Sequence, residues 1–212
     1  MKPPKRSLAR SLLLALTLVL PSAFADGVPP PAPDTALKAS IEQVQGLIHL
    51  HYAEYKAAPP EFGQVVDEVV APRFDVEAIA RLVLGMNYRS ASPEQRQRFA
   101  TAFKDMLMRT YAGAMLDNYN SSKVTWMPPR LSADGINAEI NTTLNRNDGQ
   151  SLAVGFRLHL VDGDWKVLDI SVENISLIFN YRTQVNAEIK RTGLDDVIAR
   201  MNSGEFSSSR AG

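Results

Sequence analysis

Residues 136–160, INAEINTTLNRNDGQSLAVGFRLHL, decide the fold that we expect for this 212-residue chain. Apolar and polar residues alternate twice within the stretch, first over residues 136–144 and again over 152–160. A period of two is typical of β-strands with one buried face, and the Asn-Asp-Gly sequence at 147–149 favours a turn between them. The stretch therefore predicts two antiparallel strands joined by a hairpin.

Further strands are expected on both sides of this hairpin. The Asp162-Gly163 pair predicts a second tight turn, after which Trp165–Glu173 returns as a strand. Ser122–Met127 is a shorter candidate strand. In the returning strand we expect one carboxylate-bearing face, with Asp169 and Glu173, and one more uniformly apolar face formed by Leu168, Ile170 and Val172.

Helical spacing of apolar residues surrounds the strands. The signature Ser92-Pro93-Glu94-Gln95 predicts a capping box, in which Ser92 and Gln95 satisfy each other's backbone donors, at the start of a long amphipathic helix reaching about Tyr119. The other expected helices are 34–58, with Asp34 as a cap, 61–70, 74–84, 175–193 and 194–201. The fold class is therefore α+β: an antiparallel sheet of about four strands, covered on one face by N- and C-terminal helices.

The two ends of the chain are predicted to lie outside the folded domain. Residues 1–25 combine four basic residues, the apolar run 11–20 and an Ala-x-Ala site, which predicts a signal peptide cut after Ala25 and a periplasmic protein. Ten apolar residues are too few for a membrane-spanning helix, which needs about 20. We expect a Pro-rich leader at 26–33, a single domain over 34–203 and a flexible tail over 204–212.

Composition excludes several classes of function. Without the four basic residues of the first 25, 19 basic residues (23 − 4) face 23 acidic ones, a net charge of −4. We therefore expect no nucleic-acid partner, because nucleic-acid binders cluster cations against phosphates. The absence of cysteine excludes disulfides, thiolate metal sites and cysteine nucleophiles. His49 and His51 point to different sides of a helix, so no metal site is expected, and we expect a monomer.

Known catalytic motifs are absent from the sequence, including G-x-S-x-G, H-E-x-x-H and glycine-rich phosphate loops. One enzymatic alternative remains open, in which Asp169 serves as a carboxylate base inside an apolar cone, as in isomerases or dehydratases. A binding module with a filled core is a further alternative, because apolar stripes are most often ordinary packing. We expect the protein not to be an enzyme.

Two ordered sets of motifs resemble the MlaC family, also described as toluene-tolerance or phospholipid-binding proteins. They span most of the chain after the leader: residues 74–75, 82–85, 88–96 (YRSASPEQR), 99, 103, 107 and 111–112, then 162–169 (DGDWKVLD), 173–177 (ENISL), 180–182 and 193–195. Asn174 stands where the family often has Gly.

This resemblance implies an NTF2-like type of architecture with an apolar pocket for phospholipid acyl chains between sheet and helices. It implies a carrier that exchanges lipid between an outer-membrane lipoprotein–porin complex and an inner-membrane ABC transporter, in the system that maintains outer-membrane lipid asymmetry. Phospholipid would be the bound ligand, with no other cofactor and no metal. A hopanoid-binding branch of the same family leaves a second lipid class open.

Candidate lipid-binding residues come from the resemblance and from the apolar patterns. The resemblance places pocket-lining character on Leu82, Tyr111, Leu152, Val154 and Ile175. The apolar patterns add a slot whose walls are the strand face around Phe156, with Ile170 beside it, and the helix stripe Phe99/Phe103/Met106, with Met115 as an adaptable neighbour. The candidates for contact with a lipid head group are Arg89, Arg157 and Arg182.

Overall fold

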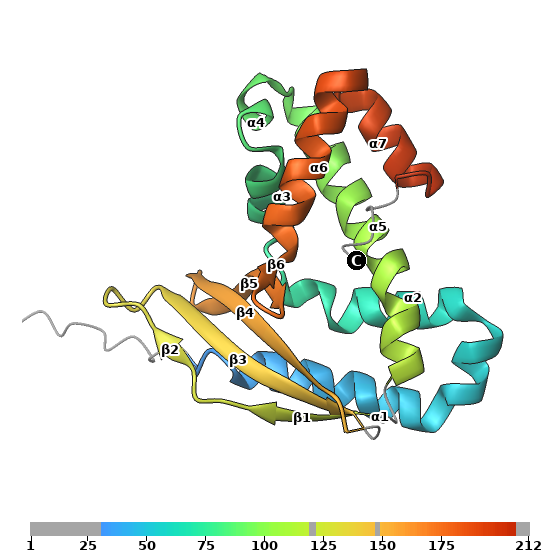
Figure 1. Cartoon of the computed structure of the whole chain (residues 1–212), viewed down its shortest axis with the longest axis vertical. Helices are drawn as coiled ribbons and strands as arrows, with labels where there is room; N and C mark the ends of the chain where they lie inside the picture. The colour runs from blue at the N-terminus through green and yellow to red at the C-terminus, as the bar shows by residue number, and fades with distance from the viewer. Residues whose placement is uncertain (1–30, 119–121, 147–148, 207–212) are drawn as a thin grey trace, which may run out of the picture.

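The computed structural model of the protein describes residues 31–118, 122–146 and 149–206, and its centre is a single antiparallel sheet (Figure 1). The strand order is β1-β3-β4-β5-β6, and β2 also pairs with β3. The four expected strands are confirmed, and two strands of two residues each were not expected. The strands are β1 (Ser122–Trp126), β2 (Arg130–Leu131), β3 (Asn137–Arg146), β4 (Ser151–Val161), β5 (Asp164–Val172) and β6 (Ile175–Ser176).

The register of the sheet differs from a regular alternation at one place. The β4–β5 turn is the expected one, because Asp162 and Gly163 both have positive φ and Val161 pairs with Asp164. Further along, Arg157 pairs with Asp169 but Leu158 pairs with Val167, so a β-bulge leaves Leu168 without a partner. The bulge corrects our assignment of the apolar face of β5.

Beyond the bulge, Val167 and Trp165 take the core positions in place of Leu168, and both are buried. A bulge shifts the alternation by one residue, so the side chains on its two sides obey different parities. Ile170 and Val172 keep the face that the sequence predicts.

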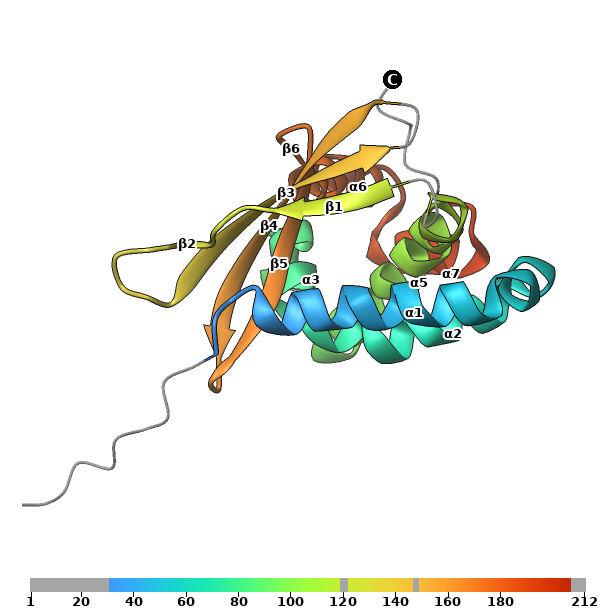
Figure 2. The ribbon, with the colours of Figure 1, turned by 90° about the horizontal axis from the view of Figure 1, so that it is seen from below.

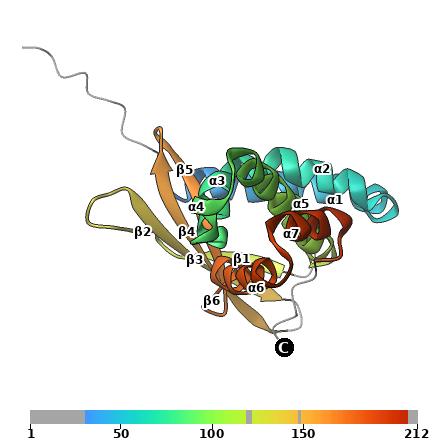
Figure 3. The same ribbon diagram turned by 90° about the horizontal axis from the view of Figure 1, so that it is seen from above.

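The helices lie on one side of the sheet and beyond its end, as Figures 1 and 3 show. Helix α1 runs along one face of the sheet, with α2 beside it (Figure 2). The helical elements are α1 (Thr35–Ala57), α2 (Pro59–Val69), the 3₁₀ turn η1 (Ala71–Arg73), α3 (Val76–Leu84), α4 (Asn87–Ser90), α5 (Pro93–Asn118), α6 (Leu177–Thr192) and α7 (Leu194–Ser203). No helix of the described residues is both long enough and apolar enough to cross a bilayer.

Most of the helices begin close to the residues that the local sequence signals predict. The capping box is confirmed, because Ser92 N–H donates to Gln95 Oε1 at 3.0 Å and Gln95 N–H donates to Ser92 Oγ at 3.2 Å. Asp34 stands at the cap position of α1, but its carboxylate pairs with Lys38 instead of capping. Ile175 and Ser176 form strand β6 before α6 begins, so the last long helix starts two residues later than expected.

Apolar side chains gather in three clusters. The helical cluster joins α3, α5, α6 and α7, a second cluster joins α1, α2 and α5, and a third joins α1 to the sheet. Phe99, Phe103 and Met106 lie in the helical cluster, where Phe103 meets Tyr181 edge-on. The prediction that this stripe of α5 faces the β4 residues is therefore wrong; α1 is the helix that packs on the sheet.

The folded domain extends beyond both predicted boundaries. Before α1, the Pro31 carbonyl accepts a hydrogen bond of 2.9 Å from the Trp165 indole. After α7, Phe206 is buried in the helical cluster and its N–H donates to the Arg200 carbonyl, so the predicted flexible tail does not begin at Gly204. The predicted signal peptide, the leader up to residue 30 and the tail from 207 lie outside the described residues.

Candidate functional site

The apolar face of the sheet is divided into two halves that differ in cover. Ala138, Ile140, Leu158, Trp165 and Val167 form what we call the sealed half, and each is buried under Leu37 and Ile41 of α1 and neighbouring side chains. The other half, which we call the apolar floor, is only partly buried throughout. Its members are Leu144, Leu152, Val154, Phe156, Ile170 and Val172.

The register places the members of the floor on the same face as the sealed half. Ile140, Phe156 and Ile170 are paired across β3, β4 and β5 in one row, and the next row holds Thr142, Val154 and Val172. The structure therefore brings four of the predicted lipid-binding residues together on the floor: Leu152, Val154, Phe156 and Ile170. A floor of this kind offers apolar contact and presents no carboxylate or ammonium group.

The floor continues into an exposed apolar edge. Ile175 pairs with Val172 across β5 and β6, and its side chain is 55% exposed. Phe179 lies in the first turn of α6 and is 70% exposed. Glu173 and Asn174 both have positive φ in the turn before β6, so Asn174 fills a position that glycine would also suit. Ile175 therefore lies at the rim of the floor, where a ligand could enter.

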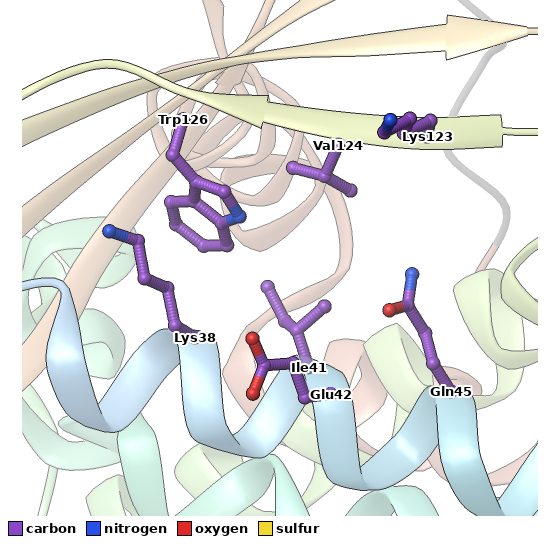
Figure 4. A pocket seen from close by; sticks show the side chains of 7 residues that line it. All are labelled: Lys38, Ile41, Glu42, Gln45, Lys123, Val124 and Trp126. Carbon is purple, nitrogen blue, oxygen red and sulfur yellow. The ribbon is translucent and has the colours of Figure 1, made fainter.

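A pocket of about 300 Å³ opens between α1 and the edge strand β1 (Figure 4). Ile41 points from α1 toward the sheet, and Val124 and Trp126 point from β1 toward α1. The Trp126 ring stacks on Phe156 with 6.4 Å between centroids, so the pocket borders the floor. None of these three residues was among the predicted lipid-binding residues. The tryptophan at the end of a short strand was the one signal in the sequence that could have indicated this site.

Tyr111 and Met115 of α5 are each about one-third exposed. The Tyr111 hydroxyl lies 3.5 Å from the hydroxyl of Tyr181, and burial, followed by this hydrogen bond, raises the pKa of Tyr111. Tyr111 therefore stays neutral over the whole physiological range. The pair joins α5 to α6, the helix whose first turn carries the exposed Phe179.

The two remaining predicted residues lie elsewhere. Met106 is buried in the helical cluster, and Leu82 packs against the same cluster from α3. Their contacts in the structure are with other side chains of the protein, away from the floor. The pattern that suggested Met106 was correct in identifying an apolar face but not in identifying its partner.

Asp169 is buried on the opposite face of the sheet from the floor. Its carboxylate accepts hydrogen bonds from the Ser176 hydroxyl at 2.6 Å and from the Ile178 N–H at 3.2 Å. Arg157 Nη2 lies 3.6 Å from the same carboxylate. These donors enclose the carboxylate and join β5 to the start of α6. The arrangement holds the start of α6 against β5 and presents no base to an apolar cavity.

The predicted head-group arginines do not line the pocket. Arg157 is next to Asp169 on the other sheet face, and Arg182 packs against Gly85. Arg89 lies in the short helix α4 and is exposed. The cations that do line the pocket are Lys38 and Lys123, which sequence reasoning had not considered. In the described residues, no three His, Asp or Glu side chains converge as metal ligands.

These features define a class: an α+β protein in which half of an apolar sheet face lacks full cover and meets a small pocket at the sheet edge. The chain belongs to the MlaC protein family, which matches residues 38–203. This confirms the family indicated by the sequence motifs.

Individual relatives agree with this assignment. The chain is 29% identical over 164 residues to the toluene tolerance protein ttg2D of Pseudomonas putida, covering 77% of this chain and 75% of that protein. It is 23% identical over 173 residues to the intermembrane phospholipid transport system binding protein MlaC of Haemophilus influenzae, covering 80% of each. Among solved structures, a phospholipid-binding protein from Ralstonia solanacearum in complex with a phospholipid superposes with a TM-score of 0.73 at 28% identity, covering 81% of this chain and 96% of that one.

Proposed function

We propose that this protein is a periplasmic carrier that holds the acyl chains of a phospholipid over the apolar floor and exchanges lipid between the outer and inner membranes. The single observation that supports this most is the floor itself, which is apolar and only partly buried in a protein whose helical cluster is tightly packed. The phospholipid bound by the Ralstonia relative supports the same ligand class.

The energetics of such a ligand suit this site. Each buried CH₂ group contributes about 0.8 kcal/mol, so two long acyl chains contribute roughly 20 kcal/mol before the cost of ordering them. Affinity of that size needs no elaborate polar recognition. It needs apolar surface shielded from water, to which the six floor residues, Trp126 and Ile175 contribute.

A matched pair of substitutions on β4 tests the binding site. Val154→Lys places a charge on the floor, whereas Ala153→Lys places the same charge on the exposed side of the same strand. After native purification and solvent extraction, we expect wild type and Ala153→Lys to release phospholipid in whole-number stoichiometry and Val154→Lys to release little. Circular dichroism and thermal melting verify folding. Full lipid content in a folded Val154→Lys variant would contradict the site.

The same extraction decides between the alternatives. Mass spectrometry of the extract separates phospholipid from hopanoid, the second lipid class open to the family. An empty wild-type protein would favour a binding module with a filled core. We infer a non-enzymatic role, supported by Asp169 being enclosed by Ser176, Ile178 and Arg157. A small apolar substrate turned over at a rate that Asp169→Asn abolishes would contradict this.

Export and transport are part of the same proposal. We propose cleavage after Ala25, so the intact mass of protein from the periplasmic fraction should correspond to a chain beginning at Asp26. The proposed partners are an outer-membrane lipoprotein–porin complex and an inner-membrane ABC transporter. Cells lacking the protein should accumulate phospholipid in the outer leaflet of the outer membrane, which labelling of surface-exposed amino lipids measures. Unchanged labelling would contradict a role in lipid asymmetry.

A further inference from the structure

Helices α3, α4 and α6 are joined along the side of the molecule away from β1 (Figure 1). The Asn186 side chain on α6 donates to the Val83 carbonyl at 2.8 Å and accepts a hydrogen bond of 2.6 Å from Asn87 Nδ2. The guanidinium of Arg182, one turn earlier on α6, lies so close to Gly85 that an added Cβ would stand 3.0 Å from its Nη2. Exposed side chains of these three helices can therefore meet the same partner.

Four arginines occupy this surface and the adjoining start of α5, and we call them the arginine cluster: Arg81, Arg89, Arg96 and Arg182. The guanidinium carbons of Arg81 and Arg96 lie 5.3 Å and 4.4 Å from the centroid of the Tyr88 ring. Arg96 also donates to the carbonyls of Tyr88 and Arg89, at 2.8 Å and 3.5 Å. Like charges gathered around one ring repel each other, so an anion lying against the cluster stabilises it.

None of the four arginines forms an ion pair with a carboxylate of the described residues. Six other described arginines do form ion pairs: Arg73, Arg98, Arg130, Arg157, Arg191 and Arg200. The sequence explains the difference, because residues 78–93 and 174–187 contain three of the four arginines and no Asp or Glu. Carboxylates border these stretches at Glu77, Glu94, Glu173 and Glu188, of which the last three accept hydrogen bonds from other groups. The surface is therefore basic, although the chain after residue 25 carries a net charge of −4.

Two exposed apolar side chains lie beside the arginine cluster. Phe179 precedes Arg182 by three residues, so the two side chains share one side of α6. Met86 directly follows Gly85 and is 86% exposed. Strand β6 pairs with β5 and leads straight into α6, so this end of the surface adjoins the rim of the floor at Ile175. Apolar side chains next to cations are typical of surfaces that enter the interfacial region of a membrane.

We propose that this surface docks the protein on a lipid bilayer that contains anionic phospholipids, with the arginine cluster against lipid phosphates and Phe179 and Met86 among the head groups. Guanidinium groups match the geometry of phosphate oxygens, and an anionic leaflet attracts each such residue. The arginines come from four helices and are spread over a surface, which suits many phosphates better than a single anion. The inference goes beyond the proposed carrier function, whose partners are protein complexes, and it places the rim at Ile175 near the membrane.

Vesicle flotation tests the docking surface. The full mature chain, as purified, is mixed at low ionic strength with vesicles of phosphatidylcholine alone or of equal parts of phosphatidylcholine and phosphatidylglycerol. We expect it to float only with the anionic vesicles and to dissociate as the salt concentration rises. Arg89→Gln and Arg182→Gln should each lower the partition coefficient about fivefold. Arg130→Gln removes the same charge from β2, far from this surface, and should lower it less than about twofold.

A second pair of variants tests the apolar contribution. Phe179→Ser should lower the partition coefficient on anionic vesicles by about threefold to tenfold, because the ring no longer leaves water on docking. Leu50→Ser changes a similarly exposed apolar side chain on α1 and should leave the coefficient unchanged. Circular dichroism verifies that each variant is folded.

Wild-type protein that does not float with anionic vesicles would overturn the docking surface, even if the same arginines bound an acidic membrane protein instead. Equal losses in Arg182→Gln and Arg130→Gln would also overturn it, because they would show a response to net charge alone. A loss of bound phospholipid in Arg182→Gln would assign that arginine to the lipid site and remove its docking role. The phospholipid content of the purified wild type tests the carrier function separately, so the two proposals fail by different measurements.

Discussion

The helical cluster and the apolar floor both consist of apolar side chains, yet these side chains are buried to different degrees. In the helical cluster, Val83, Phe99, Val185 and Val197 have no exposed surface, and aromatic rings meet in stacked and edge-on pairs. No member of the floor reaches that level of burial. A protein interior normally packs as densely as an organic crystal. The chain therefore completes one core by itself and leaves the other partly uncovered, which is the feature on which the proposed lipid site rests.

The largest expected effect comes from removing equivalent rings from the two regions. Phe103→Ala empties a fully buried position between Phe99 and Tyr181 and should lower the free energy of unfolding by about 3–5 kcal/mol. Phe156→Ala on the floor should cost less than about half as much in delipidated protein, because its ring is already partly in water. Urea denaturation of both variants measures the difference.

Equal losses in these two variants would erase the contrast between the regions. Phe99→Ala provides a second test within the helical cluster, since its side chain has no exposed surface. It should behave like Phe103→Ala. A loss as small as that of Phe156→Ala would show that the helical cluster relaxes around cavities.

The next largest effect should come from the presence or absence of bound lipid, measured as a change in Tm. A ligand present at a hundred times its Kd stabilises the folded state by about 2.7 kcal/mol, which raises the Tm of a domain of this size by roughly 5–10 °C. Delipidation should therefore lower the Tm of wild type, and hydrogen exchange should increase most in β4 and β5. The Tm of Val154→Lys should not respond to added lipid, whereas that of Ala153→Lys should.

Substitutions in the hydrogen-bonded link between β5 and the start of α6 should have an intermediate effect on the free energy of unfolding. Asp169→Asn removes a carboxyl acceptor that holds both Ser176 and the first turn of α6, and we expect a loss of about 1–3 kcal/mol in unfolding free energy. Ser176→Ala removes one of these hydrogen bonds and also the cap on Phe179 N–H, so it should lose a similar amount. Denaturation in urea provides the measurement. Wild-type stability in both variants would show that other contacts hold the start of α6 against β5.

The smallest effect concerns a surface ion pair inside the helical region. Hydrogen bonds from Arg191 and then Arg200 lower the pKa of Glu188 from 4.5 to about 2. A depressed folded-state pKa contributes stability above the ordinary pKa, and that stability is lost as pH falls from about 4.5 toward 2. Glu188→Gln should therefore melt slightly lower than wild type at neutral pH, with the difference disappearing over this window. Glu68→Gln should show no such pH-dependent difference.

Several features could be predicted because a few neighbouring residues determine them. The capping box at Ser92 depends on contacts within one turn of helix, and the Asp162-Gly163 turn depends on residues that tolerate positive φ. The floor residues of β4 followed from simple alternation. The bulge at Leu168 could not be predicted, because it depends on how β5 pairs with β4 and no residue type announces it.

The candidate site was predictable in part for the same reason. Phe156 was a candidate because strand periodicity defines its face, and Val154, which the resemblance indicated, lies on the same face of β4. Met106 was placed on the wrong wall, because an apolar stripe shows that a helix face is buried but not which element buries it. Trp126 and Lys38 were missed because their pocket forms between β1 and α1, which are separated by most of the helical region in the sequence.

The α+β class, the limits of most helices and strands, and the family could all be predicted from the amino-acid sequence, since periodicity, caps, turns and ordered motifs are local properties of the chain. Which apolar residues are fully covered and which are not depends instead on the packing of elements that are distant in the sequence. Ile140 and Phe156 are paired on adjacent strands and share one face, yet α1 and its neighbours cover the first completely and the second only in part. Cover depends on the position of distant helices, and that position is set by the packing of the whole domain.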